Sequence, residues 1–471
     1  MTQRIEPIRI RACLGLLLAV AGCSPPCPPA VVSSTPSRPE PTGPIRHVVL
    51  VSLDGLMPDV YLHPEAHQLK IPTLRWLAEQ GAVSDGVQSV FPSVTYPSHT
   101  SMVTGVDPGK HGITSNRTFD QMDIDLESWH WFADEIKVEP IWRLAKQRGF
   151  QTAMIHWPVT VGAQVDWLVP EFWRAKNVND QKLMRVVSTP GLLDGVAREN
   201  PDFWSRYVPP NVSDDALTDI AIYVMAHARP NLLLLHLVEI DGAQHRHGID
   251  SPEARGAIET DDRQLARLYE AIRRLGMAND TAVVVVSDHG FRGASKMVRP
   301  CVLLKSGGLV ELGEDGKVRN WKASINTNSG SAYVYINDKG DFATREVVSG
   351  IFHAQLEKQD SGIGRVYFAD EIRARGGDPA AYLALEAAED YQFGPGCGGE
   401  YVAPPAYHAT HGFDPLRPEM HASLLMQGPG IAHGRIPNAR LIDIAPTIAG
   451  WLGLNMSQVD GVKLGVQTVA R

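Results

Sequence analysis

HVVLVSLD, residues 47–54, is a short apolar run that ends in an aspartate. Three similar runs follow: NLLLLHLVEID (231–241), TAVVVVSDH (281–289) and HASLLMQG (421–428). Continuous runs of valine and leucine are typical of strands buried on both faces, as in a largely parallel sheet. Amphipathic stretches between them predict helices at IPTLRWLAEQGA (71–82), PIWRLAKQRG (140–149) and AIETDDRQLARLYEAIRRLG (257–276). This alternation predicts an α/β fold with a central sheet flanked by helices.

Three of the predicted strands end in acids, Asp54, Asp241 and Asp288. A lone aspartate after a strand is more often a turn residue or a helix cap than a ligand. In open α/β sheets, however, ligands bind beyond the carboxyl ends of the strands. We therefore expect the three carboxylates to meet in one crevice.

Three histidines, His245, His289 and His411, accompany these acids in the motifs DGAQH, SDHG and HGFD. A mixed set of nitrogen and oxygen ligands suits zinc and disfavours magnesium or calcium. Six ligands are enough for two catalytic zinc sites, because each such site usually takes three protein ligands. Two metal ions about 4 Å apart can hold the attacking and leaving oxygens of a phosphoryl displacement.

FPSVTYPSHTSMVT, residues 91–104, places Thr95 between two prolines in a segment without helical periodicity. Taken alone, a threonine here is best explained as a turn hydroxyl that bonds its own backbone. With two metal sites nearby, a proline-fixed loop could instead hold the hydroxyl in line with a phosphorus atom, where coordination deprotonates it. Thr95 is therefore the candidate nucleophile and a candidate metal ligand.

The first 23 residues resemble a bacterial lipoprotein signal peptide. Three arginines precede the apolar run 12–22, which is shorter than the roughly 20 residues that a transmembrane helix needs. The run ends in VAGC, a lipobox-like sequence that predicts lipidation at Cys23. We expect a lipid-anchored protein of the bacterial cell envelope, at the outer membrane and facing the periplasm; a plain signal peptide cleaved near Gly22 is the alternative.

Residues 24–44 read SPPCPPAVVSSTPSRPEPTGP and predict an extended, proline-rich tether ahead of a catalytic body at 45–471. In an oxidising compartment Cys301 and Cys397 could form a disulfide, or they could stay free. The net charge is −9, with acids and bases interleaved, so the chain lacks the basic stripe of a nucleic-acid-binding protein. No protein partner is evident from the sequence.

Six motifs in one order carry a family resemblance: VSLDG, FPSVTYPSH, TGVDPGKHGITSN, DGAQHRHGIDSPE, VVSDHG and HGFD. Together they resemble the nucleotide pyrophosphatase/phosphodiesterase family of the alkaline phosphatase superfamily, from about residue 45 to the C-terminus. The resemblance implies an alkaline-phosphatase-like sandwich and a two-zinc phosphodiesterase. About 120 residues separate His289 from His411, and an insertion within about 291–410 is expected to form a smaller cap lobe that selects the substrate.

The resemblance also implies a role for each motif residue. The first zinc would be held by Asp241, His245 and His411, and the second by Asp54, Asp288 and His289. Thr95 would form a phosphothreonine intermediate, which water then hydrolyses. Asn116 and the backbone N–H of Tyr96 would donate hydrogen bonds to a phosphoryl oxygen.

Other positions carry weaker expectations. The Tyr96 ring is a candidate platform for a nucleobase, or it only packs the loop. His99 and His111 are expected to be structural hydrogen bonders. Gln244 stands where relatives usually have glycine, so the backbone just before His245 is expected to differ from theirs.

Two alternative functions remain open at this stage. A phosphomonoesterase or phosphonate hydrolase on the same two metals would use cations against the dianion, and Arg174 and Lys176 are candidates. A lipid-anchored binding protein without catalysis would be expected to lack the nucleophile or a ligand, but every position is occupied. No cysteine lies near Thr95, which argues against a sulfatase.

Overall fold

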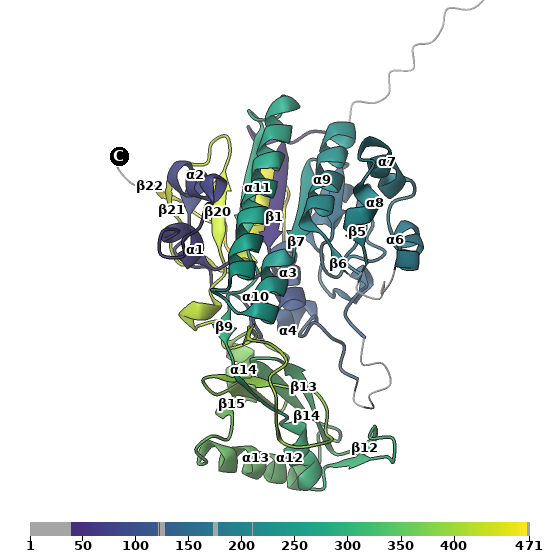
Figure 1. The fold of residues 1–471 in the computed structure, drawn as a ribbon, viewed down its shortest axis with the longest axis vertical. Helices are drawn as coiled ribbons and strands as arrows, with labels where there is room; N and C mark the ends of the chain where they lie inside the picture. Colours follow the sequence, from purple (N-terminus) through teal and green to yellow (C-terminus); the bar gives the residue numbers. More distant parts are fainter. Residues whose placement is uncertain (1–38, 121, 123–127, 173–177, 210, 469–471) are drawn as a thin grey trace, which may run out of the picture. The chain divides into compact units, whose positions relative to one another are not determined.

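Five parallel strands, from β8 to the edge strand β4, form one side of a nine-stranded sheet with the order β22-β21-β2-β20-β8-β1-β7-β3-β4 (Figure 1). The computed structural model describes residues 39–120, 122, 128–172, 178–209 and 211–468. The parallel strands are β8 (Thr281–Val286), β1 (His47–Leu53), β7 (Leu232–Leu237), β3 (Thr152–Ile155) and β4 (Trp167–Val169). The outer strands are β20 (Leu424–Gln427), β2 (Ala82–Val83), β21 (Gly434–Arg435) and β22 (Gln467–Thr468).

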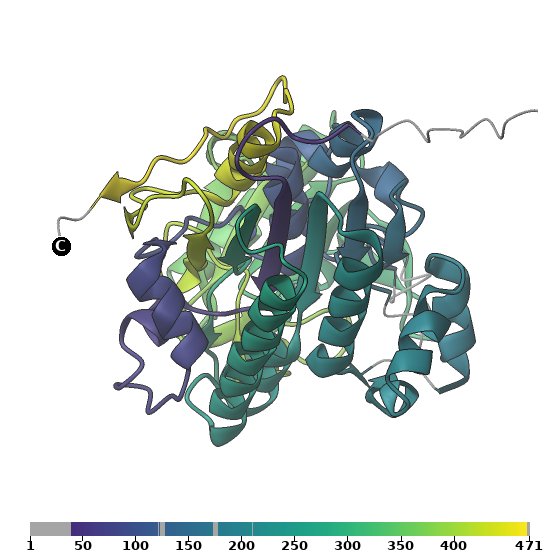
Figure 2. The ribbon, with the colours of Figure 1, turned by 90° about the horizontal axis from the view of Figure 1, so that it is seen from above.

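Helices cover both faces of this sheet (Figure 2). One face carries α2 (Pro72–Gln80), α9 (Asp214–Ala228) and α11 (Pro252–Arg274), and the other carries α3 (Thr95–Thr104), α5 (Ile141–Gln147) and α15 (Ile444–Leu452). In β1, Val49 and Val51 pack on the first side, and Val48 and Leu50 on the second. Both side-chain sets of a central strand must therefore be apolar. The predicted α/β fold with a largely parallel, helix-flanked sheet is confirmed.

Two of the predicted strands differ from the structure in extent or direction. β7 ends at Leu237, and α10 (Glu239–His247) begins before Asp241, so Asp241 lies in the first turn of a helix and not at the end of a strand. β20 runs antiparallel to β8, a direction that an apolar run cannot reveal. Shorter helices are α1 (Pro58–Leu62), α4 (Pro108–His111), α6 (Gln181–Val187), α7 (Leu192–Glu199) and α8 (Phe203–Arg206).

A separate lobe, the cap, leaves the sheet where β9 (Arg292–Gly293) pairs with β19 (Ala409–Thr410). It contains a four-stranded sheet of β13 (Ala323–Asn328), β14 (Ser331–Ile336), β16 (Leu383–Ala387) and β15 (Ile363–Phe368). Its helices are α12 (Cys301–Ser306), α13 (Phe342–Leu356) and α14 (Ala369–Ala374), below the central sheet in Figure 1. Cys301 and Cys397 form a disulfide. The cap falls within 291–410, where the sequence predicts an insertion.

Within the part of the chain that the structure describes, no helix combines the length and the apolar character needed to cross a bilayer. The apolar run 12–22, Cys23 and the tether up to residue 38 lie outside the described residues, as do Arg174 and Lys176.

Candidate active site

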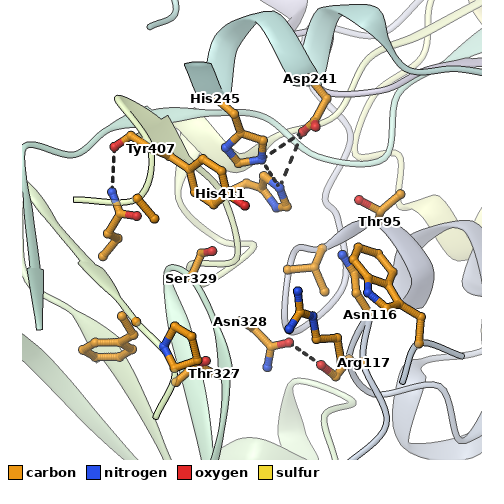
Figure 3. Close-up of a pocket in the computed structure, with 18 of the residues that line it drawn as sticks. Thr95, Asn116, Arg117, Asp241, His245, Thr327, Asn328, Ser329, Tyr407 and His411 are labelled. Atoms are coloured by element: carbon orange, nitrogen blue, oxygen red, sulfur yellow. Dashed lines mark hydrogen bonds and ion pairs between the residues drawn. The ribbon is translucent and has the colours of Figure 1, made fainter. Parts of the chain in front are cut away.

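A cavity of about 1230 Å³ lies between the carboxyl ends of the central strands and the cap (Figure 3). Six of the predicted site residues line it: Asp54, Thr95, Asn116, Asp241, His245 and His411. The cap contributes Asn326, Thr327 and Asn328 from the end of β13 and Ser329 from the turn that follows. Residues from distant parts of the chain therefore share one chamber.

The first predicted ligand set converges on one point (Figure 3). Asp241 and His245 lie one turn apart on α10, and His411 follows β19. Asp241 Oδ1 is 3.3 Å from His245 Nε2 and 3.6 Å from His411 Nε2, and the two nitrogens are 3.2 Å apart. Three candidate ligand atoms thus face each other across the space of a single ion.

The second predicted set gathers around His289. Its Nε2 lies 3.1 Å from Asp288 Oδ2 and 3.4 Å from Asp54 Oδ1. Asp54 directly follows β1, and Asp288 and His289 follow β8, the neighbouring strand. Among the described residues, the groups that could hold a metal ion are Asp54, Asp288 and His289, and Asp241, His289 and His411. His289 Nε2 therefore lies close to both sets.

All three predicted histidine ligands turn Nδ1 toward a backbone carbonyl. The distances are 2.8 Å from His245 to Ala409 O, 3.1 Å from His289 to Gly290 O and 3.1 Å from His411 to Ser93 O. A carbonyl only accepts, so Nδ1 carries the proton and Nε2 presents a lone pair to the site. Burial also lowers the pKa of His289 to about 3 and that of His411 well below its usual value.

The hydrogen bonding of the buried aspartates shows whether metal cations fit this site. Asp54 Oδ1, Asp241 Oδ1 and Asp288 Oδ2 are buried and have no hydrogen bond within the described part of the chain. The second oxygen of Asp288, in contrast, accepts from the N–H of Gly55 at 3.1 Å. Burial, followed by the charges of Asp288 and Asp241, raises the pKa of Asp54 well above its usual value. Because unpaired buried carboxylate oxygens are costly, these residues fit divalent cations such as zinc.

Thr95 is the first residue of helix α3, which corrects the expectation of a loop. The segment shows no helical periodicity because all ten residues of α3 are buried, so no polar face exists. Pro97 is tolerated because the N–H groups of the first turn have no partner within the helix. Thr95 Oγ1 lies 3.5 Å from His289 Nε2, and the positive end of the helix dipole favours negative charge at this position.

Asn116 and Tyr96 contact each other. The backbone N–H of Tyr96 donates to Asn116 Oδ1 at 2.8 Å, so in this structure it is not directed at a ligand as expected. The same bond fixes the amide with its oxygen toward α3 and its NH₂ group on the other side. The NH₂ group of Asn116 can therefore still donate to a ligand, and the Tyr96 N–H orients the Asn116 side chain.

The Tyr96 ring is not an open stacking platform. It is fully buried, and its hydroxyl donates to Glu171 at 3.1 Å. Trp129 packs against the ring with centroids 5.1 Å apart, and Trp129 lines the cavity. The Tyr96 ring therefore only packs the interior, which is the second of the two roles expected for it. Trp129, which no sequence motif indicated, supplies an aromatic wall of the cavity.

His99 and His111 are structural, as predicted. His99 contacts Thr95 O and Ser52 Oγ, each at 2.8 Å. His111 lies 2.9 Å from Ser101 Oγ and accepts from the N–H of Ile113. With both ring nitrogens engaged, neither histidine can serve as a ligand without breaking these bonds.

The sequence did not point to His236, and it singled out Gln244 only as a departure from glycine. His236, in the apolar strand β7, lies 3.1 Å from Asp54 Oδ2 and 2.8 Å from Glu171 Oε2. A histidine inside an apolar run was the available signal. Gln244 donates to Gly55 O at 2.9 Å and so ties α10 to the loop that carries Asp54. Gln244, which replaces the usual glycine, therefore links the helix that carries Asp241 and His245 to the loop that carries Asp54.

The geometry brings together side chains that could hold metal ions beside a threonine hydroxyl, and a comparison with known families gives the class of the protein. The model of the family described as type I phosphodiesterase / nucleotide pyrophosphatase matches residues 48–414. The match covers most of the chain and includes Thr95 and all six predicted metal ligands. The protein therefore belongs to this family. The resemblance inferred from the six motifs is confirmed.

Individual relatives are distant. Ectonucleotide pyrophosphatase/phosphodiesterase family member 1 of Mus musculus is 25% identical over 254 residues, 52% of this chain and 24% of that protein. Bis(5'-adenosyl)-triphosphatase of Bos taurus is 24% identical over 251 residues, 53% of this chain and 48% of that protein. The alignments thus span less than half of either relative. The structure of human ectonucleotide pyrophosphatase/phosphodiesterase 5 is similar in fold, with a TM-score of 0.62 and 19% identity, and the match covers 88% of this chain and 97% of that one.

Proposed function

We propose that the protein is a zinc-dependent phosphodiesterase or nucleotide pyrophosphatase that works through a phosphothreonine intermediate. The observation that carries the proposal is the convergence of three unpaired carboxylate oxygens and three imidazole Nε2 atoms beside Thr95. Asp241, His245 and His411 would hold one zinc ion, and Asp54, Asp288 and His289 the other.

Thr95 is the nucleophile in this mechanism. Its Oγ1 attacks phosphorus, the leaving-group oxygen departs on the opposite side, and water then cleaves the phosphothreonine. When bound, the two zinc ions would polarise the phosphoryl oxygens and favour the deprotonated hydroxyl of Thr95. The NH₂ group of Asn116, fixed by its bond to the Tyr96 N–H, donates to the charge that grows on a non-bridging oxygen.

The test is a comparison of a diester with a monoester. We expect kcat/KM for bis(4-nitrophenyl) phosphate to exceed that for 4-nitrophenyl phosphate by about tenfold or more on zinc-loaded protein, because the matching family is described by its action on phosphodiesters. A ratio below one would favour a phosphomonoesterase or phosphonate hydrolase. No turnover of either ester would favour the non-catalytic binding protein.

Nucleotides are the proposed substrates. A murine relative with 20% identity was solved as an inactive variant in complex with AMP, and the bovine relative is named for an adenosine-containing substrate. In this chain Trp129 is one of the aromatic residues that line the cavity and could receive a nucleobase. The Trp131 ring is stacked on the Trp129 ring at 5.7 Å, and the Arg117 guanidinium lies over the Trp129 ring at 5.6 Å.

Trp129→Ala should raise KM for the 4-nitrophenyl ester of thymidine 5'-monophosphate about tenfold, since stacking of a base is worth roughly 1–3 kcal/mol. KM for methyl 4-nitrophenyl phosphate, which has no base, should change much less. Phe132→Ala is the control, because Phe132 is 49% exposed and does not line the cavity. Equal losses on both substrates would show that Trp129 only supports the fold.

Lipidation at Cys23 and a place at the periplasmic side of the outer membrane are proposed on the sequence alone. Cleavage before Cys23 with an attached acyl group, detected by mass spectrometry of the protein from membranes, would support the anchor. A soluble form that begins near Gly22 would contradict it.

A further inference from the structure

Helix α10, which carries Asp241 and His245, begins without a cap of its own. Its N-cap residue, Val238, offers no side chain that can bond the first N–H groups. Those groups are instead bound by Asp214: Oδ1 accepts from Val238 N at 2.9 Å, and Oδ2 accepts from Glu239 N at 2.8 Å. Asp214 is the first residue of α9, so the cap comes from a neighbouring helix.

The contact is reciprocal and partly buried. Glu239 Oε1 accepts from the backbone N–H of Asp214 at 3.0 Å, so each helix start satisfies a donor of the other. Asp214 is completely buried. Loss of its carboxylate would leave the N–H groups of Val238 and Glu239 without this acceptor, which costs stability and releases the helix start.

A second buried acid supports Asp214 from α11, which packs against both α9 and α10. Asp261 is also completely buried, lies within hydrogen-bonding reach of the Asp214 carboxyl, and neither of its oxygens has a donor among the described residues. Two carboxyl groups in such contact share a proton, because two buried like charges repel. Burial, and then Glu239, raises the pKa of Asp214 to about 7, and burial, and then Asp214, raises that of Asp261 well above its usual value.

We propose that Asp214 and Asp261 form a proton-sharing carboxyl pair that fixes the start of α10 and thereby positions Asp241 and His245 for metal binding. Protonated Asp261 donates to Asp214, which leaves Asp214 free to accept from α10. Asp214 and Asp261 are positioning residues: neither touches the metal or the substrate. The inference rests on the proposed function only in that Asp241 and His245 bind a metal ion.

The experiment measures zinc affinity by competition with a chelator, and the visible spectrum of the cobalt-substituted protein, on the full chain. Asp214→Asn and Asp261→Ala should weaken one of the two metal sites about tenfold or more, the usual effect of losing a supporting contact. Asp261→Asn should stay within about twofold of wild type, since its amide replaces the donating carboxyl hydroxyl.

The matched control is Asp262→Asn. Asp262 is the next residue of α11, is also buried, and caps α2 from outside by accepting from the N–H groups of Thr73 at 3.2 Å and Leu74 at 2.7 Å. Because α2 carries no ligand, this variant should lower thermal stability but leave zinc affinity and the cobalt spectrum unchanged.

Unchanged affinity in Asp214→Asn, or an equal loss in Asp262→Asn, would overturn the proposal. So would Asp261→Asn behaving like Asp261→Ala. Metal affinity is measured without turnover, so a wild type that binds zinc but cleaves no phosphodiester refutes only the proposed activity. A wild type that takes up no divalent metal refutes both.

Discussion

Thr95→Ala is expected to lower kcat/KM for bis(4-nitrophenyl) phosphate by about a thousandfold or more, as removal of a nucleophile does in other covalent mechanisms. Thr95 Oγ1 is the hydroxyl oxygen 3.5 Å from His289 Nε2, and it begins a helix whose N-terminus favours negative charge. Steady-state kinetics on zinc-loaded protein provide the measurement, and zinc content is checked in parallel.

Two variants separate chemistry from folding. Thr95→Ser keeps a hydroxyl and should retain part of the activity, with trapped phosphoserine detectable by mass spectrometry. Thr100→Ala removes another buried hydroxyl of α3, whose bond to Tyr96 O is 2.8 Å long, and should change kcat/KM by less than about threefold. If Thr95→Ala keeps more than about a tenth of wild-type activity, Thr95 is not the nucleophile.

The centre of the fold could be predicted because its strands are apolar on both faces. That pattern located β1, β7 and β8 and so identified the sheet edge where Asp54 and Asp288 lie. Strand direction, as for β20, depends on connections that the run itself does not encode. The sequence predicts that β7 continues to Asp241, because the run NLLLLHLVEID extends to that residue. In the structure β7 ends at Leu237 and α10 begins at Glu239.

Those site residues could be predicted whose chemistry requires a particular side chain. Residues whose role depends on tertiary packing could not be predicted from the sequence. Metal ligands need imidazole and carboxylate groups, which stand out in a sequence. The burial of Tyr96 depends on Trp129, a residue 33 positions later whose contact no local pattern reveals. The same holds for Asp214, because a cap supplied by a different helix leaves no capping motif at the start of α10.

Removal of metal is the second large effect expected. Dialysis against a chelator should reduce diester hydrolysis by about a thousandfold or more, and zinc should restore it, because the site places the carboxylates of Asp54, Asp241 and Asp288 together without hydrogen-bond donors for one oxygen of each. The free energy of unfolding should fall as well: a site at a free zinc concentration 1,000 times its Kd contributes about 4 kcal/mol. Activity, zinc content and thermal unfolding are measured on the same samples.

Histidine variants show whether this dependence comes from the proposed ligands. His411→Ala should lower the zinc content toward one ion per chain and abolish most activity. His111→Gln removes another buried histidine, but one whose nitrogens are bonded to Ser101 and Ile113, so it should cost about 1–3 kcal/mol of stability and leave zinc content unchanged. Full hydrolysis by protein shown by elemental analysis to hold no metal would rule out the two-metal mechanism, whereas equal zinc loss in both variants would mean that unfolding, and not ligation, explains the effect.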